Sequence, residues 1–406
     1  MLTLTYEYKL KPTKQQVIDI ENILTVCCKV WNYALRERKD WVKSRKCKVN
    51  ACSLEYEYII KADEPFPNYH IQAKSLTEAK KTNPELKSVN AQVLQQVLRT
   101  LDRAWDDMIK RNFGFPRCKN HFRMRSLVFP QLKGDIIRAN HIKLPQLGWV
   151  KFHQSRVLPD GFIIKQARVV KRASGYFVML SLQLDVKVPD TPFYGHPIGV
   201  DVGLESFLAT SEGTIVARPK FLKSLQRKLE LLQRRLRNKK IGSNNRKKLN
   251  TKIARLHQKI ADTRKDFQFK TAHKICTQGD SIFVEDIDFR AWAKGFFCKH
   301  TLDAGFGEFF NILSYLSWKR GKYFGKVDKN GTSQICPNCD AHTGKKPLAV
   351  RIHSCPECGY TINRDVAAAQ VIRNRGVLAV GQPVSEIASR GVLSGASGNT
   401  RLDKCQ

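Results

Sequence analysis

The chain has 406 residues, 42% of them hydrophobic, which is enough for about two to four domains with their own cores. Its 71 lysine and arginine residues outnumber its 36 aspartate and glutamate residues, so the formal net charge at pH 7 is +35. This excess argues against an enzyme of small neutral metabolites and favours a polyanionic partner, of which nucleic acid is the most common.

The distribution of apolar residues predicts neither a membrane protein nor a secreted one. The sequence contains no run of about 18 apolar residues, and residues 1–12 alternate polar and apolar side chains instead of forming the core of a signal peptide. A chain of this length does not need disulfides to hold a core. We therefore expect a cytoplasmic protein whose scattered cysteines are reduced thiols. These are Cys27, Cys28, Cys47, Cys52, Cys118, Cys276, Cys298 and Cys405.

The N-terminal third combines one strand pattern with two helix patterns. Residues 1–9 place leucines and tyrosines on one face of a short strand. Apolar residues at helical spacing then predict long amphipathic helices near 17–35 and 94–108. Residues 42–87 are polar and mixed, and no element can be assigned to them. We expect a helical domain over 10–122.

The hydrophobic period changes to two between residues 123 and 190. Residues 178–186 alternate apolar with polar side chains, and 162–170 form another apolar run. Ala173-Ser174-Gly175 between these runs is a hairpin-turn sequence. We expect a small β domain over 123–190, which the strand at 1–9 joins although the helices are inserted between them.

Residues 220–265 are expected to form a basic helical hairpin. Leucine and isoleucine recur at helical spacing on both arms, with a turn at 241–245. The segment has seventeen lysine and arginine residues and only two acids, whereas a merely solvated helix usually mixes both signs. Contact with phosphates is therefore favoured over a solvated face. The candidate nucleic-acid-binding residues are Arg227, Arg234, Arg235, Arg237, Arg246, Lys247 and Lys248.

Four cysteines have the spacing of a zinc ribbon. They form two Cys-x-x-Cys pairs separated by fifteen residues, and four thiolates make a closed, structural tetrahedral site rather than a catalytic one. Gly359 follows the second pair, where a left-handed residue relieves the turn, and Asp340 takes this place after the first pair. We expect His342 and His353 to be surface or hydrogen-bonding residues instead of ligands. The four ligands are Cys336, Cys339, Cys355 and Cys358.

Three acidic residues stand at the ends of predicted elements. Asp201 ends an apolar run, Glu285 ends another, and Asp365 opens an alanine-rich helix. Strand ends and a helix start can meet at one edge of a sheet, where three carboxylates would repel each other unless hard cations such as Mg²⁺ held them. Two such ions about 3.5–4 Å apart stabilise the attacking and leaving oxygens of phosphodiester hydrolysis.

Each of these acids, taken alone, also has a structural explanation. Asp201 could close a turn, Asp365 could be a favourable acid at a helix N-terminus, and Glu285 could be an exposed strand end. Their joint presence in a strongly basic chain favours a metal-dependent nuclease.

The chain resembles the TnpB family, RNA-guided endonucleases encoded by insertion sequences and related to CRISPR nucleases that have one RuvC-like domain. The resemblance rests on Gly199–Gly203, Val284–Asp286, the cysteine ribbon and Asn363–Asp365, followed by three alanines. Weaker matches extend along nearly the whole chain in family order. The main departure is Asp340 in the first cysteine pair.

The resemblance implies an α/β multidomain fold. An RNase H-like (RuvC) nuclease domain over 195–375 would contain the helical hairpin and a zinc ribbon over 333–361. A wedge-like β-barrel domain over 1–9 and 123–190 would be interrupted by a helical recognition domain over 10–122, and 376–406 would be a flexible tail.

The resemblance also implies the activity. Asp201, Glu285 and Asp365 would be the catalytic acids that hold Mg²⁺ or Mn²⁺, and zinc would be structural. One chain would bind one guide RNA derived from the transposon end and cut double-stranded target DNA, in a bacterial or archaeal cytoplasm near the nucleoid. Two alternatives remain at this point: a guided DNA-binding repressor without cleavage, and a DNA transposase.

Overall fold

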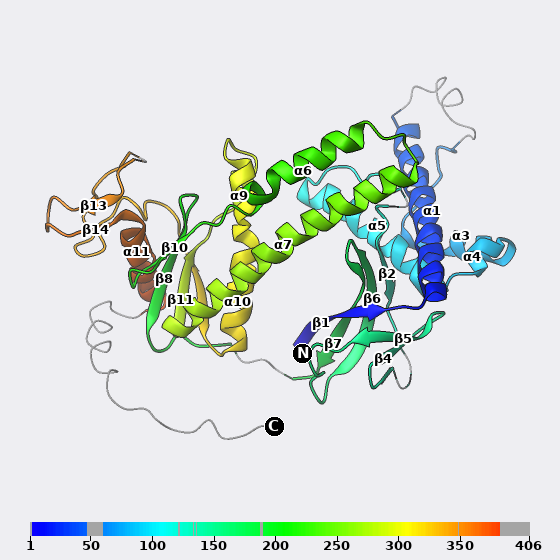
Figure 1. The fold of residues 1–406 in the computed structure, drawn as a ribbon, viewed down its shortest axis with the longest axis horizontal. Coiled ribbons are helices and arrows are strands. Elements are labelled where there is room, and N and C mark those ends of the chain that lie inside the picture. The colour runs from blue at the N-terminus through cyan, green and yellow to red at the C-terminus, as the bar shows by residue number, and fades with distance from the viewer. Residues whose placement is uncertain are drawn as a thin grey trace. The chain divides into compact units, whose positions relative to one another are not determined.

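The computed structural model describes residues 2–46, 60–120, 122–132, 134, 136–186, 190–347 and 349–381, and the chain divides into two compact units between residues 188 and 189 (Figure 1). No helix among these residues is long and apolar enough to cross a membrane. Of the eight scattered cysteines, five are described and all five are free thiols, whereas Cys47, Cys52 and Cys405 lie outside the described residues.

The first unit contains seven antiparallel strands in one sheet, in the order β2-β6-β7-β1-β5-β4-β3. The N-terminal strand β1 pairs with both β5 and β7, which confirms that it joins the strands that follow the helices. The strands are β1 (Leu2–Lys11), β2 (Ser126–Phe129), β3 (Ile137–Arg138), β4 (His141–Leu144), β5 (Gly148–His153), β6 (Ile163–Arg172) and β7 (Gly175–Leu184).

Two details of this sheet can be compared with the sequence prediction. Strands β6 and β7 form the expected hairpin, with Arg172 opposite Gly175 at its turn. The ladder does not close, because the edge strands β2 and β3 do not pair with each other within the described part of the chain. The described strands therefore form one curled sheet, and the β-barrel stays a prediction.

The helices of the first unit lie between β1 and β2 in the sequence. Thr13 begins the first helix with a capping box, in which its hydroxyl accepts from the Gln16 backbone and the Gln16 side chain accepts from the Thr13 backbone. Both expected long helices are present, and the described parts of the unassigned segment 42–87, residues 42–46 and 60–87, contain two further helices. The helices are α1 (Lys14–Ser44), α3 (Tyr69–Thr82), α4 (Pro84–Lys87) and α5 (Ala91–Arg111).

The second unit contains a five-stranded mixed sheet in the order β10-β9-β8-β11-β12. The strands β8, β11 and β12 are parallel, and β9 and β10 are antiparallel to their neighbours. A separate two-stranded ladder joins β13 to β14. The strands are β8 (Pro197–Val202), β9 (Ser206–Thr210), β10 (Ile215–Ala217), β11 (Ser281–Glu285), β12 (Tyr323–Val327), β13 (Ile352–Ser354) and β14 (Thr361–Asn363).

The two faces of this sheet have different cores. Alternate residues of β8 and β11, such as Ile198 and Ile282, pack with Ala272 and Leu313 in one cluster, so α7 and α10 cover that face. Phe283 packs with Ile372 in another cluster, so α11 covers the opposite face. The helices are α6 (Phe221–Arg237), α7 (Asn244–Gln278), α8 (Phe289–Trp292), α9 (Cys298–Ala304), α10 (Phe306–Lys319) and α11 (Arg364–Ala379).

Two predicted boundaries in this unit are wrong. Helix α7 continues well past 265, because its last turns bury Ala272 and Ile275 in the core. Helix α11 continues past the predicted start of the tail at 376, because Gly376 and Val377 are buried against the sheet. The remainder of the predicted tail, 382–406, lies outside the described residues.

Candidate functional site

Asp201 and Glu285 lie beside each other because their strands are parallel and in register. Phe283 of β11 is opposite Gly199 of β8, and Val284 is opposite Val200. One step further along, the same register brings Glu285 opposite Asp201. Residues two apart on a strand share a face, so both acids face the side that α11 covers.

Helix α11 brings the third acid to the same place. Its N-terminal residue Asn363 accepts hydrogen bonds from the backbone N–H groups of Asp365 (2.9 Å) and Val366 (3.4 Å), which fixes the start of the helix. One turn later the helix lies flat on β8 at Gly199. A Cβ atom on Gly199 would lie only 1.9 Å from the carbonyl oxygen of Ala369. The glycine thus permits the close approach that places Asp365 near Asp201.

The electrostatics show that the three carboxylates share one site. Burial raises the pKa of Asp201 well above its ordinary value, and the charges of Glu285 and Asp365 raise it further. Burial also raises the pKa of Glu285, whereas a hydrogen bond donated by the Thr332 hydroxyl opposes this rise. Ionising all three groups is therefore costly unless cations compensate for the charge.

The carboxylates are spaced more widely than a single closed metal site would require. Among the described residues, the only group of three or more Cys, His, Asp or Glu side chains with all ligand atoms within 4.8 Å is the set of four cysteines. The acids instead form an open edge, which suits hard cations that also bind water and a phosphate oxygen.

Arg351 is a residue at this site that the sequence analysis missed. One nitrogen of its guanidinium, Nη1, lies 3.9 Å from Oδ1 of Asp365, and another nitrogen pairs with the carboxylate of Glu205. Arg351 belongs to the loop between the two cysteine pairs, so the ribbon contributes a positive charge to the acid cluster. No sequence signal distinguishes it from the other basic residues of that loop.

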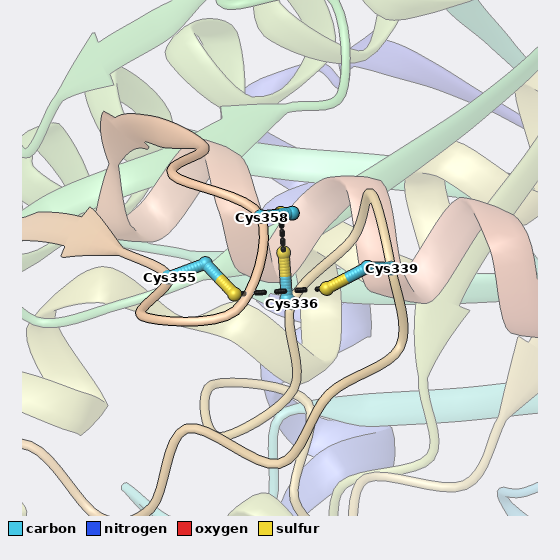
Figure 2. Close-up of side chains that lie close together, drawn as sticks. All are labelled: Cys336, Cys339, Cys355 and Cys358. Carbon is cyan, nitrogen blue, oxygen red and sulfur yellow. Dashed lines mark hydrogen bonds between the residues drawn. The ribbon is translucent and has the colours of Figure 1, made fainter.

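The Sγ atoms of the four cysteines all lie within 4.8 Å of one another (Figure 2). The Sγ atoms of Cys336 and Cys358 are 3.6 Å apart, as are those of Cys339 and Cys355. Four sulfurs at about 2.3 Å from a central zinc would be roughly 3.8 Å apart, so the geometry fits such an ion. The Tyr360 backbone N–H lowers the pKa of the Cys358 thiol to about 6, whereas burial raises the pKa of the Cys336 thiol.

The turns that hold the cysteines have the backbone predicted from sequence. Asp340 and Gly359 both adopt the left-handed conformation, with φ of 57° and 71°. Each donates its N–H at 3.0 Å to the carbonyl of the first cysteine of its pair. The two histidines differ from each other: His342 is exposed, whereas His353 is buried, with its Nδ1 2.7 Å from the Lys346 Nζ.

The helices α6 and α7 form the expected hairpin and expose most of its basic residues. Six of the seven candidates are exposed, and none of the six forms an ion pair with a residue in the described ranges. They are Arg227, Arg234, Arg235, Arg237, Lys247 and Lys248. Their charges are therefore available to a polyanion.

Arg246, the seventh candidate, is used inside the hairpin. Its Nη1 donates to the carbonyl oxygens of Leu236 (3.0 Å) and Lys239 (2.8 Å), and the side chain is half-buried. It satisfies carbonyls at the end of α6 and so fixes the turn into α7. Its first role is thus structural.

Three family models match different parts of the chain. The OrfB model of IS605, described as "Probable transposase", matches residues 181–294, and the "Cas12f1-like, TNB domain" model matches 306–372. A model described as "Helix-turn-helix domain" matches residues 1–47. In the structure, the described part of that last range contains a strand and one long helix, β1 and α1.

Two curated relatives match nearly the full length. The chain is 28% identical over 386 residues to a "Putative RNA-guided DNA endonuclease" of Streptomyces pristinaespiralis, covering 92% of this chain and 89% of the relative. It is 28% identical over 400 residues to the "Putative RNA-guided DNA endonuclease InsQ" of Escherichia coli strain K12, covering 93% and 94%.

The solved structures that match the chain are more distant. A Cas12f1 complex with single-guide RNA and target DNA has a TM-score of 0.33 and 17% identity, over 92% of this chain and 99% of that chain. The mini-RNA-guided endonuclease CRISPR-Cas_phi3 has a TM-score of 0.39 and 13% identity, over 59% and 57%.

Proposed function

Because this chain belongs to the TnpB family, also known as OrfB of IS605, we propose that it is the RNA-guided DNA endonuclease of an insertion sequence. One observation supports this most strongly: three carboxylates meet at a sheet edge in a chain whose net charge is +35. Carboxylates that lie together despite their mutual repulsion are typical of a site that binds cations. A chain with this large a positive charge is typical of a protein that binds a polyanion. Metal-dependent cutting of nucleic acid requires both features.

The domain assignment follows from the same proposal. The sheet order of the second unit, with two parallel and two antiparallel strand pairings, supports an RNase H-like domain, so residues 195–375 would be the RuvC-like nuclease. The open sheet and the helices of the first unit would be the wedge and recognition domains. One chain would hold one guide RNA, derived from the transposon end, against a double-stranded target.

The three acids would hold the catalytic cations. Asp201, Glu285 and Asp365 provide oxygen ligands for two Mg²⁺ or Mn²⁺ ions, which when bound activate a water and stabilise the departing 3′ oxygen. Thr332 orients Glu285 through its hydrogen bond. Arg351, beside Asp365, places a fixed positive charge where a phosphate would approach.

The four cysteines would hold one structural zinc ion. We expect Cys339→Ser to lower the zinc content well below one ion per chain, because three thiolates leave the tetrahedral site incomplete. The measurement is elemental analysis of the purified full chain. Cys118→Ser, which removes an equally exposed cysteine outside the cluster, should keep the wild-type content. Unchanged zinc in the Cys339 variant would refute the assignment.

The exposed basic face of α6 should bind nucleic-acid phosphates. Replacing Arg234, Arg235 and Arg237 by glutamate should weaken binding and make the plot of log affinity against log salt shallower by about two to three, roughly one per lost phosphate contact. The matched control replaces the same residues by lysine, which keeps the charge and should keep the slope. A glutamate variant with the wild-type slope would show that this face is only solvated.

RNA that copurifies with the chain tests the proposed function before any assay of cutting. We expect one discrete structured RNA, protected along part of its length, at about one molecule per chain. A transposase that acts without a guide would copurify with no such RNA. A guided repressor would also hold the RNA, and only metal-dependent cutting separates it from the endonuclease.

A further inference from the structure

The segment between β11 and α10 exposes aromatic side chains that the acid site does not use. Phe296 is 96% exposed, Phe297 is 51% exposed and Trp292 is 37% exposed. Large aromatic residues are rarely left this open without a partner. We call these three residues the aromatic patch; the Phe296 and Phe297 rings are 5.3 Å apart at 88° to each other.

The base of this patch is held firmly. The Trp292 ring packs edge-on against Phe289 (5.6 Å between centroids) and Phe306 (6.2 Å), both of which belong to the core side of the segment. Trp292 therefore stays in place while part of its ring remains open. A fixed ring face costs little conformational entropy when a flat partner stacks on it.

The charge around the patch is positive. Residues 289–302 contain no acid, and they contain Arg290, Lys294 and Lys299. Neither lysine forms an ion pair with any residue that the structure describes, whereas the flanking acids Asp286 and Asp288 are already paired with Lys326 and Arg290. An apolar protein surface could not pair with the lysines between the rings, whereas the phosphates of a polyanion could.

The patch adjoins both functional regions of the second unit. Helix α8 begins shortly after Glu285 ends β11. Helix α9 contacts α6, as Figure 1 shows, and Asp303 at its end accepts a 3.0 Å hydrogen bond from the Leu222 backbone. Arg264 of α7 also donates to the Leu302 carbonyl at 3.0 Å. The segment that carries the rings is therefore joined to the acid edge at its start and held against the basic hairpin at its end.

We propose that Trp292, Phe296 and Phe297 form a stacking platform for the bases of an unpaired DNA strand, with Lys294 and Lys299 on its phosphates. Open rings alternating with unpaired lysines are what a single strand requires, since every base has a flat face and every nucleotide a charge. A duplex hides its base faces and could not use the rings. The inference rests on the proposed function, because the platform would hold the strand near the acids that cut it.

Binding of a fluorescent oligothymidine to the purified full chain, with its copurified RNA in place, tests the platform. Phe296→Leu and Phe297→Leu should each weaken binding roughly five-fold or more with an unchanged salt slope, because stacking is lost while charge is kept. Phe296→Tyr should bind like wild type. Lys294→Ala should make the salt slope shallower. Tyr315→Ala, which removes a 38% exposed ring on α10, is the matched control and should change nothing.

Photocrosslinking gives a second readout that does not depend on affinity. An oligonucleotide containing 5-bromodeoxyuridine should crosslink to the tryptic peptide that spans residues 295–299.

The stacking platform would be overturned if the leucine variants bound oligothymidine as tightly as the wild type, or if crosslinks formed only at other peptides. Leucine variants that bind normally while alanine variants change the oligomeric state would assign the patch to a protein partner. Loss of oligouridine binding alone would assign it to the guide RNA. Guide-dependent cutting by the wild type is scored separately, so failure of the platform and failure of the endonuclease proposal are distinguishable.

Discussion

Replacing Asp201, Glu285 or Asp365 by alanine should reduce cutting of guide-matched DNA by roughly a thousand-fold or more, about 4 kcal/mol of transition-state stabilisation. Each substitution removes a cation ligand but only a small volume of side chain, so the fold should survive. Binding should also survive, because the basic surfaces are untouched. The measurement pairs a cleavage rate with a binding assay on the same duplex.

Two controls separate loss of the cation site from loss of the fold. Glu308→Ala removes an exposed acid of the same unit and should cut like wild type. Mg²⁺ should raise the melting temperature of the wild type more than that of each acid variant, since a ligand that binds only the folded state stabilises it. Wild-type cutting by Asp365→Ala would show that the third ligand is misassigned. Cutting in excess EDTA would contradict the metal mechanism.

Gly199→Ala should destabilise the second unit by about 3 kcal/mol or more and reduce cutting about a hundred-fold. The new Cβ would lie 1.9 Å from the Ala369 carbonyl oxygen and 2.6 Å from the Arg373 backbone nitrogen. Backbone atoms of a packed helix cannot turn away as a side chain can, so α11 must move and take Asp365 with it. Thermal melting and cleavage rates measure the two effects.

Two other glycines provide a graded comparison. At Gly376 the added Cβ would lie 2.2 Å from the buried Phe283 ring, which has little room to move, so Gly376→Ala should also destabilise the second unit, though without a backbone clash between α11 and β8. At Gly307, on α10, the nearest atom is 3.7 Å away in the Phe289 ring, so Gly307→Ala should be neutral or slightly stabilising. If the Gly199→Ala variant has the same melting temperature and cleavage rate as the Gly307→Ala variant, the close packing of α11 on β8 does not position the acids.

The features that the sequence predicts well are those set by local chemistry. Asp201 and Glu285 follow short apolar runs, which form the strands β8 and β11 as expected, and the parallel register of these strands places the two acids together. Asp340 was predicted to adopt the left-handed conformation because the cysteine turn requires it and an aspartate tolerates it, and its φ is 57°. The zinc-ribbon spacing likewise fixed which four cysteines converge.

The features that it missed depend on contacts between elements, which spacing rules do not indicate. Arg351 reaches Asp365 only because the ribbon folds back over the sheet edge, which no spacing rule indicates. In the sequence, nothing distinguishes Arg246 from the basic residues beside it. In the structure, its guanidinium donates to two backbone carbonyls at the turn of the hairpin. The sequence prediction starts the tail at Gly376, because glycine often ends a helix. In the structure α11 continues past this residue, since the glycine allows close packing on Phe283.

Cutting of two duplexes by one preparation tests the central claim most directly. The purified chain, with its copurified RNA, is incubated with Mg²⁺ and either a duplex matched to that RNA or a duplex of equal length with a mismatched sequence. We predict cutting of the matched duplex only, and none of either duplex in EDTA. Binding of the matched duplex without any cutting in Mg²⁺ or Mn²⁺ would contradict the account and support a guided repressor, and equal cutting of both duplexes would show that the RNA does not guide the site.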